Sequence, residues 1–251
     1  MDERVRNLLY RRPELYELVY PEPNAETAAM CRRMFQRYLD RFPSSVLDVG
    51  CGTGRDLAGL CPDCSDLVGV DALAEMIAYA RSLRPQIVFQ VGDMRTFRLG
   101  RSFDAVLCMG SALMYALTNA DIDATLETFA AHSHPGTLLI LDLNNAAGYL
   151  PGGCFKSEAE TELTLPQFTA SARAAYRFDR RRQLLVRTRT WQIPDQAAIH
   201  DYCEYRLFFP AELDGLLESK GFRTAGLFDN LELRESDLSG PRLYVASLFR
   251  P

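Results

Sequence analysis

The feature that most constrains this chain is an apolar strand that runs directly into a glycine-rich turn. Residues 45–54 read Ser-Val-Leu-Asp-Val-Gly-Cys-Gly-Thr-Gly. Gly50, Gly52 and Gly54 permit a positive φ and let a ligand approach the backbone with no Cβ in the way. The spacing G-x-G-x-G differs from the G-x-G-x-x-G of a dinucleotide fingerprint, and no phosphate-cradling lysine follows. The turn therefore predicts a ligand site of another kind at the end of a buried strand.

Short apolar runs alternate with helical stretches through this part of the chain. The expected strands are residues 46–49, 67–70, 87–91, 103–108 and 138–143, with two more at 222–228 and 243–249. Helices are expected between them, at 72–83 and 121–131. This alternation is typical of a parallel sheet with helices on both faces. We expect an α/β, Rossmann-like, doubly wound, mostly parallel seven-stranded sheet.

The segments on either side of this part of the chain have different sequence patterns. The first forty residues look helical and amphipathic, whereas residues 148–209 alternate like antiparallel strands, with a hairpin tip at 179–182. Pro210–Lys220 begins with proline and is followed by Gly221, as expected of a helix. We expect a single domain with four parts: a helical lid (1–44), a cofactor-binding core (45–147), an antiparallel insertion over the acceptor site (148–209) and a closing helix and strands (210–251).

Composition excludes several other classes of protein. The 251 residues are 47% hydrophobic and 24% charged, which is ordinary for a globular chain. A net charge of −5 disfavours non-specific nucleic-acid binding. No apolar run is long enough for a membrane span, and the start lacks the features of a signal peptide. Seven cysteines, an odd number, favour free thiols, and three histidines make a histidine-rich metal site improbable, so we expect a cytoplasmic protein with no metal.

Two acidic residues follow the next two expected strands. Asp71 ends Gly69-Val-Asp71, where a carboxylate is placed to bond a ribose diol. Asp93 begins Asp93-Met94, a pair that suits an adenine, with the carboxylate accepting from the amino group and the methionine packing on the ring.

In these blocks and in Phe103-Asp-Ala-Val-Leu-Cys-Met109, the sequence resembles the class I S-adenosylmethionine-dependent methyltransferases over roughly residues 45–145. Within that superfamily it is most similar to the nucleotide-aminosugar N,N-dimethyltransferases of antibiotic biosynthesis. Residues 92–101, 15–20 and 206–212 carry this narrower likeness.

The resemblance implies S-adenosylmethionine as cofactor and S-adenosylhomocysteine as product. The residues that it places around the cofactor are Tyr20, Asp48, Gly50, Cys51, Gly52, Gly54, Asp71, Ala72, Met76, Asp93, Met94, Cys108 and Met109. Of these, Asp48 and the glycine turn would hold the methionine moiety, and Tyr20 would reach across cofactor and acceptor. The alternative for Asp48 is a turn-stabilising carboxylate, and for Tyr16 and Tyr20 it is packing of helix on core.

The segment after the fifth strand departs from these relatives, which carry a strongly aromatic stretch along the acceptor site. Here it reads Asp142-Leu-Asn-Asn-Ala-Ala-Gly-Tyr149, and the single tryptophan, Trp191, is distant. The Asn-Pro-Pro-Tyr pattern of methyltransferases that act on DNA bases or protein amides is also absent. We therefore expect a small-molecule acceptor whose identity stays open.

A sulfonium is already an activated donor, so an amine acceptor needs only orientation and a free lone pair, whereas a hydroxyl or carbon acid needs a general base. The candidates for a catalytic base are His200, Glu204, Tyr115, Tyr20 and His132. His200, Tyr202, Glu204 and Arg206 would share one face of a strand, which either lines the acceptor pocket or is solvated. Seven arginines between residues 173 and 189 would either bind a phosphorylated acceptor or form a solvated hairpin.

These observations favour methyl transfer from S-adenosylmethionine to a small amine of natural-product or aminosugar biosynthesis. The alternatives are O- or C-methylation assisted by a general base, and a cofactor-binding protein that transfers no methyl group. Neither a nucleic acid nor a membrane is expected as partner. An exposed edge of the insertion could pair with a second copy, so a homodimer stays open.

Overall fold

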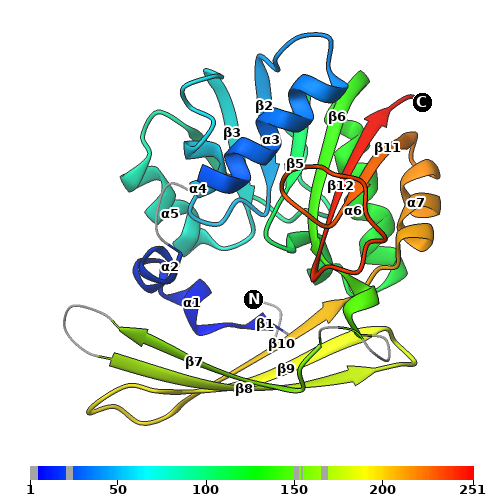
Figure 1. Ribbon diagram of the computed structural model, residues 1–251. Helices are drawn as coiled ribbons and strands as arrows, with labels where there is room; N and C mark the ends of the chain where they lie inside the picture. The colour runs from blue at the N-terminus through cyan, green and yellow to red at the C-terminus, as the bar shows by residue number, and fades with distance from the viewer. Residues whose placement is uncertain (1–4, 21–24, 150–152, 154, 165–168) are drawn as a thin grey trace.

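The computed structural model describes residues 5–20, 25–149, 153, 155–164 and 169–251. Two β-sheets face each other across a thin layer of N-terminal helices (Figure 1). Among the described residues, no helix is both long and apolar enough to cross a membrane.

The larger sheet has seven strands, and its existence confirms the predicted fold class. In spatial order it runs β11 (Phe222–Phe228), β12 (Arg242–Phe249), β6 (Ser133–Asn144), β5 (Phe103–Cys108), β2 (Ser45–Val49), β3 (Asp66–Asp71) and β4 (Val88–Val91). The contacts among β2 to β6 are parallel, and β12 is antiparallel to both of its neighbours. The chain leaves β2 to one side for β3 and returns on the other side for β5. This reversal of strand order opens a crevice at the carboxyl ends of the strands, where open α/β sheets bind ligands.

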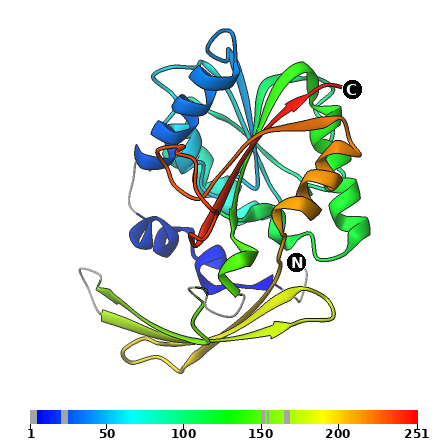
Figure 2. The ribbon, with the colours of Figure 1, turned by 45° about the vertical axis from the view of Figure 1, so that its right-hand side comes forward.

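Helices cover both faces of this sheet (Figure 2). On one face, α3 (Ala25–Tyr38), α4 (Arg55–Ala58) and α5 (Ala74–Leu83) bury their apolar sides. On the other face, α6 (Asn119–Ala131) and α7 (Pro210–Glu218) do the same. The two apolar layers hold the strand ends rigidly in place, which a binding site at those ends requires.

The smaller sheet has five antiparallel strands and lies below the carboxyl ends of the larger one (Figure 1). In spatial order it runs β1 (Val5–Arg6), β10 (Ile199–Arg206), β9 (Leu184–Gln192), β8 (Thr169–Asp179) and β7 (Glu158–Thr164). The antiparallel insertion and the hairpin tip between β8 and β9 are as predicted. Strand β1 was not expected, since the first residues look helical. It forms because Val5 and Arg6 pair with Cys203 and Tyr202, residues that lie almost two hundred positions away.

Two short helices, α1 (Leu8–Arg11) and α2 (Pro13–Val19), fill the space between the sheets. Leu8, Leu9 and Leu15 pack on Trp191 and on alanines of β8. On its other side, α2 is tied to the larger sheet through Glu17. That carboxylate accepts hydrogen bonds from Arg84 at 3.1 Å and from the hydroxyl of Thr53, a residue of the glycine turn. The N-terminal segment therefore joins both sheets.

Candidate active site

The glycine turn after β2 is held in a conformation that side chains would not tolerate. Gly50 has φ +79° and Gly54 has φ +83°, in the left-handed region. A Cβ on Gly50 would lie 2.5 Å from the Cβ of Ala112. The amides of Gly50 and Cys51 both donate to the carbonyl of Val70, at 2.7 and 3.1 Å. The turn thus lies flat against the end of β3 and presents bare backbone to the crevice.

Asp71, at the end of β3, is locked to this turn. Its Oδ2 accepts from the amide of Gly52 at 2.9 Å, and its Oδ1 accepts from the amide of Leu73 at 2.9 Å. Burial raises the pKa of this carboxyl group although the two amides act in the opposite direction. Each carboxylate oxygen has a second lone pair, so the group can still accept from a ligand's two hydroxyls.

Asp48 lies two residues before the turn and is fully buried, with 1% exposure. Within the described part of the chain, neither of its carboxylate oxygens has a hydrogen-bond partner. Burial and the neighbouring Asp56 and Asp71 raise its pKa well above the ordinary value. The hydrogen bonds of a turn-stabilising carboxylate are therefore missing, and a buried acid is left under the turn with its bonding capacity unused.

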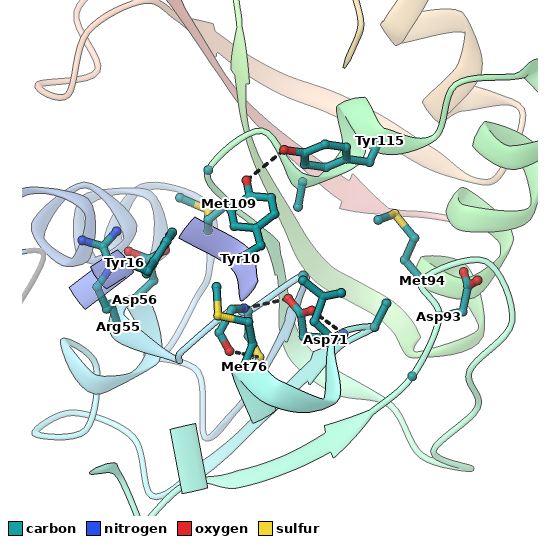
Figure 3. A pocket seen from close by; sticks show the side chains of 18 of the residues that line it. Tyr10, Tyr16, Arg55, Asp56, Asp71, Met76, Asp93, Met94, Met109 and Tyr115 are labelled. Atoms are coloured by element: carbon teal, nitrogen blue, oxygen red, sulfur yellow. Dashed lines mark hydrogen bonds between the residues drawn. The ribbon is translucent and has the colours of Figure 1, made fainter. Parts of the chain in front are cut away.

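Asp93 is held differently, because Arg95 clasps both of its oxygens at 2.6 and 2.9 Å. This pairing lowers the pKa of Asp93. Arg95 also bonds Asp121, at 2.8 Å. Asp93 reaches the crevice as an ion pair rather than as a free carboxylate, and the adjacent Met94 presents an apolar side chain (Figure 3).

These elements enclose a cavity of about 530 Å³, within the size range of small-molecule sites. Nine of the predicted cofactor residues line it: Gly50, Cys51, Gly52, Asp71, Ala72, Met76, Asp93, Met94 and Met109. Four others do not line it: Tyr20, Asp48, Gly54 and Cys108. The cofactor roles of all thirteen residues remain predictions.

Two tyrosines close the far side of the cavity. Tyr10 of α1 and Tyr115, in the 3₁₀ helix η1 (Ala112–Tyr115), bring their hydroxyl oxygens to 2.9 Å from each other (Figure 3). Burial raises the pKa of Tyr10 to about 12 and that of Tyr115 well above its ordinary value, so both are neutral phenols near pH 7. The ring of Tyr205 packs behind Tyr115, at 5.2 Å between centroids. Tyr115 was a predicted catalytic residue, whereas Tyr10 was not singled out because no local signal sets it apart from a core tyrosine.

Tyr16 and Tyr20 form a second aromatic group, at the lid. Their rings lie 4.9 Å apart, and the guanidinium of Arg55 stands over both. Tyr16 lines the cavity, whereas Tyr20, at the end of α2, is 44% exposed and is not among the described residues that line it. Of the two rings, the structure places that of Tyr16 at the cavity, and the role of Tyr20 remains a prediction.

The other base candidates lie elsewhere. His200 is exposed and contacts Thr190 at 3.0 Å, and Glu204 accepts from the hydroxyl of Tyr202 at 2.7 Å. The even-numbered residues lie on the face of β10 opposite to Cys203 and Tyr205, which belong to the apolar core, although Glu204 is itself only 6% exposed. The odd-numbered Asp201, Cys203 and Tyr205 face inward instead.

His132 is part of the core, where it bridges the amide of Leu99 and the carbonyl of Thr128 at 2.9 and 2.7 Å. None of His132, His200 and Glu204 is among the described residues that line the cavity.

Asp142, at the end of β6, lines the cavity and was missed by the sequence analysis. Its Oδ2 accepts from the amide of Gly110 at 3.1 Å, and its Oδ1 accepts from Nε of Arg242 at 3.0 Å. Arg242 also donates to the hydroxyl of Ser111, at 3.1 Å. Because Ser111 has φ +69°, these bonds hold a strained loop at the wall of the cavity. The position of Asp142 at the end of a predicted strand was the signal that could have found it.

The fold is that of Rossmann-like methyltransferase domains, and residues 46–136 match the family model described as "Methyltransferase domain". The resemblance found in the motifs is thereby confirmed for the cofactor-binding core. The chain is 36% identical over 160 residues to dTDP-3-amino-3,6-dideoxy-alpha-D-glucopyranose N,N-dimethyltransferase of Streptomyces fradiae, covering 59% of this chain and 61% of that protein. It is 34% identical over 131 residues to a dTDP-3-amino-3,4,6-trideoxy-alpha-D-glucopyranose N,N-dimethyltransferase of Streptomyces venezuelae, covering 51% and 55%. The matches thus span little more than half of these relatives.

Solved structures extend the similarity of fold to the whole chain. An amino pentose methyltransferase from Micromonospora echinaspora, solved with S-adenosylmethionine bound, superposes with a TM-score of 0.76 at 24% identity over 99% of this chain and all of that one. A sugar N-methyltransferase from Streptoalloteichus gives 0.78 at 21% identity, over 100% and 96%. The five-stranded sheet and the lid therefore belong to the shared fold.

Proposed function

We propose that this protein transfers a methyl group from S-adenosylmethionine to the amine of a small molecule, an aminosugar or a related natural-product intermediate. The observation that carries the proposal is a cavity in which the glycine turn and Asp71 face the Tyr10–Tyr115 hydroxyl pair. One side of that cavity suits a nucleoside linked to an amino acid, and the other side presents hydroxyls to an acceptor.

The residues present fit the cofactor. Bare backbone at Gly50 and Gly52 leaves room for the methionine part, and Asp71 has free lone pairs for two ribose hydroxyls. Met76 and Met94 offer apolar walls for a purine. Asp48, with no hydrogen-bond partner among the described residues, is a buried acid that a cationic group or a water molecule near the turn would satisfy. Asp93 would act together with Arg95, to which it is already bonded.

S-adenosylmethionine supplies a methyl group on a sulfonium, which needs no further activation. The chain must therefore align the acceptor, exclude water and receive a proton. Orientation alone contributes up to roughly 7–11 kcal/mol in favourable cases. The hydroxyl of Tyr115 is placed to accept the N–H of an acceptor amine while its own proton bonds to Tyr10. Tyr10 lines the same cavity, so its own proton can pass to water there.

An amine is favoured over a hydroxyl or carbon acceptor by the chemistry of the cavity wall. No histidine is among its described lining residues, and both tyrosines are neutral phenols near pH 7. A neutral phenol can pass on the proton of an ammonium but cannot ionise an alcohol. The sugar-amine relatives support an aminosugar as the acceptor.

Calorimetric titration with S-adenosylmethionine and S-adenosylhomocysteine tests the cofactor. Binding of both is expected, and binding of neither by folded, ligand-free protein would overturn the proposal. Methyl transfer is then measured with dTDP-linked aminosugars, simple amines and phenols. Transfer to phenols alone would replace the amine by a hydroxyl, and cofactor binding without transfer to any acceptor would leave a protein that only binds.

A further inference from the structure

A buried guanidinium lies behind the two tyrosines. Arg187 is in the middle of β9, and its side chain is 11% exposed. Its Cζ lies 5.5 Å from the centre of the Tyr205 ring, which in turn packs on Tyr115. The inward face of the five-stranded sheet thus carries a positive charge one ring away from the cavity.

This charge is neutralised only in part by a carboxylate. The nearest carboxylate, Asp201, accepts from Arg189 at 2.6 Å and from the indole of Trp191 at 2.9 Å. Arg187 is 3.8 Å from Asp201, and its hydrogen bond is to the sulfur of Cys203 at 3.2 Å. Its Nε is buried and, within the described residues, has no partner. Because Asp201 bonds mainly to Arg189, the positive charge of Arg187 also acts on the phenol groups next to it.

The groups next to this charge are mainly phenols. The groups that face Tyr115 are Tyr10 from α1, Tyr205 and Cys203 from β10, and Arg187 from β9. Arg187 is the only cation in this set, while each of the others becomes negative when it loses a proton. A positive charge nearby favours negative charge on a phenol oxygen.

We propose that Arg187 is a positioning residue for the Tyr10–Tyr115 pair, because its buried charge makes the Tyr115 hydroxyl a better proton donor to Tyr10. The catalytic purpose of Arg187 rests on the proposed function, whereas its electrostatic effect on Tyr115 does not. In the step it serves, the acceptor's N–H proton passes to Oη of Tyr115 as the proton of Tyr115 moves to Oη of Tyr10. The proton of Tyr10 leaves to water, so each tyrosine ends neutral.

The field is measurable without any acceptor. Tyr115 is replaced by 3,5-difluorotyrosine, which titrates at lower pH than tyrosine, and its ¹⁹F resonance is followed against pH. R187M, which removes the charge but keeps the length, is expected to move the midpoint up by about one pH unit. R187K keeps the positive charge, so its titration midpoint is expected to stay close to that of the unaltered protein. R173M is the matched control, because Arg173 lies on the outer face of the same sheet and its side chain is 77% exposed.

An unchanged midpoint in folded R187M would overturn the inference, and so would equal shifts in R187M and R173M. R187Q replaces R187M if the latter does not fold, as judged by circular dichroism. Once an acceptor is found, R187M should lower kcat several-fold and displace its pH profile to higher pH, with affinity for S-adenosylmethionine unchanged. Failure of cofactor binding would refute the proposed function, yet leave the ¹⁹F result standing.

Discussion

Glu17 on α2 and Arg84 beyond α5 form a buried ion pair, 3.1 Å long, with side chains that are 12% and 3% exposed. Arg84 also donates to the carbonyl of Thr53 at 2.6 Å, so the pair clamps the N-terminal helices onto the glycine turn. Breaking a buried pair costs about 3–5 kcal/mol, because the remaining charge is left uncompensated. We expect E17A to lower the free energy of unfolding in urea by that amount and to weaken binding of S-adenosylmethionine.

Glu14 on the same helix offers the control, since its pair with Arg12 is exposed. E14A should cost less than about 1 kcal/mol. Equal losses in E14A and E17A would show that the clamp has no special role.

The conformation of the glycine turn predicts the effect of adding a side chain at Gly50. G50A places a methyl group 2.5 Å from Ala112 at φ +79°, so both the turn and η1 must shift. We expect a lower melting temperature and at least tenfold weaker calorimetric binding of S-adenosylhomocysteine. G100A has a positive φ of +68° and open space around the added methyl, and Gly100 is not among the described residues that line the cavity, so this variant should show the conformational cost alone, about 1–2 kcal/mol. Normal binding by G50A would argue against close approach of the ligand to this turn.

Asp71 is expected to hold the ribose. D71A should weaken binding of S-adenosylmethionine by about 1.5–3 kcal/mol, the value of hydrogen bonds to a charged acceptor. D66N changes an acid at the other end of the same strand, where the side chain is 44% exposed, and should bind normally. Unchanged affinity in folded D71A would remove this residue from the ribose role.

Tyr115 is expected to act on turnover and not on cofactor binding. Y115F removes the hydroxyl that receives the proton. We expect kcat to fall by about 10²-fold, which is the lower end of the range of rate enhancement that proton transfer by a side chain provides. H200A should turn over normally, because His200 lies on the outer face of the five-stranded sheet. Loss of activity in H200A together with full activity in Y115F would reverse this assignment.

His132 predicts a pH dependence of stability. Burial lowers its pKa, and the neutral ring both accepts from Leu99 and contacts the carbonyl of Thr128. The unfolded chain therefore binds a proton more readily, so this contribution is complete above the unfolded pKa of about 6.5 and is lost as pH falls through the folded value. Urea midpoints measured between pH 8 and pH 5 should fall less steeply in H132Q than in the unaltered protein. Parallel curves would exclude His132 as the source.

Much of the fold was readable in the sequence because its signals are local. The bounds of β5 and β11 are those expected from apolar runs that end at turns, and the glycines at 50, 52 and 54 all adopt positive φ. Strand β1 was not readable, since two residues carry no periodicity and their partner lies at the far end of the insertion.

The alternation along β10 showed that its two faces differ, but not which of them is turned inward. From the sequence alone, His200 and Tyr205 are equally good candidates for the inward face of the strand. The pairing with β9 and the packing of α1 bury Tyr205 and expose His200.

The sequence by itself determined the seven-stranded sheet, the glycine turn and the positions of the acids at the ends of β3 and β4, because each depends on ten or so neighbouring residues. Only the tertiary structure decided which side chains lie across the cavity from the glycine turn. Tyr10, Tyr115, Arg187 and Tyr205 come from four separate elements. They meet because two sheets close over α1, and such a meeting depends on packing that no local pattern records.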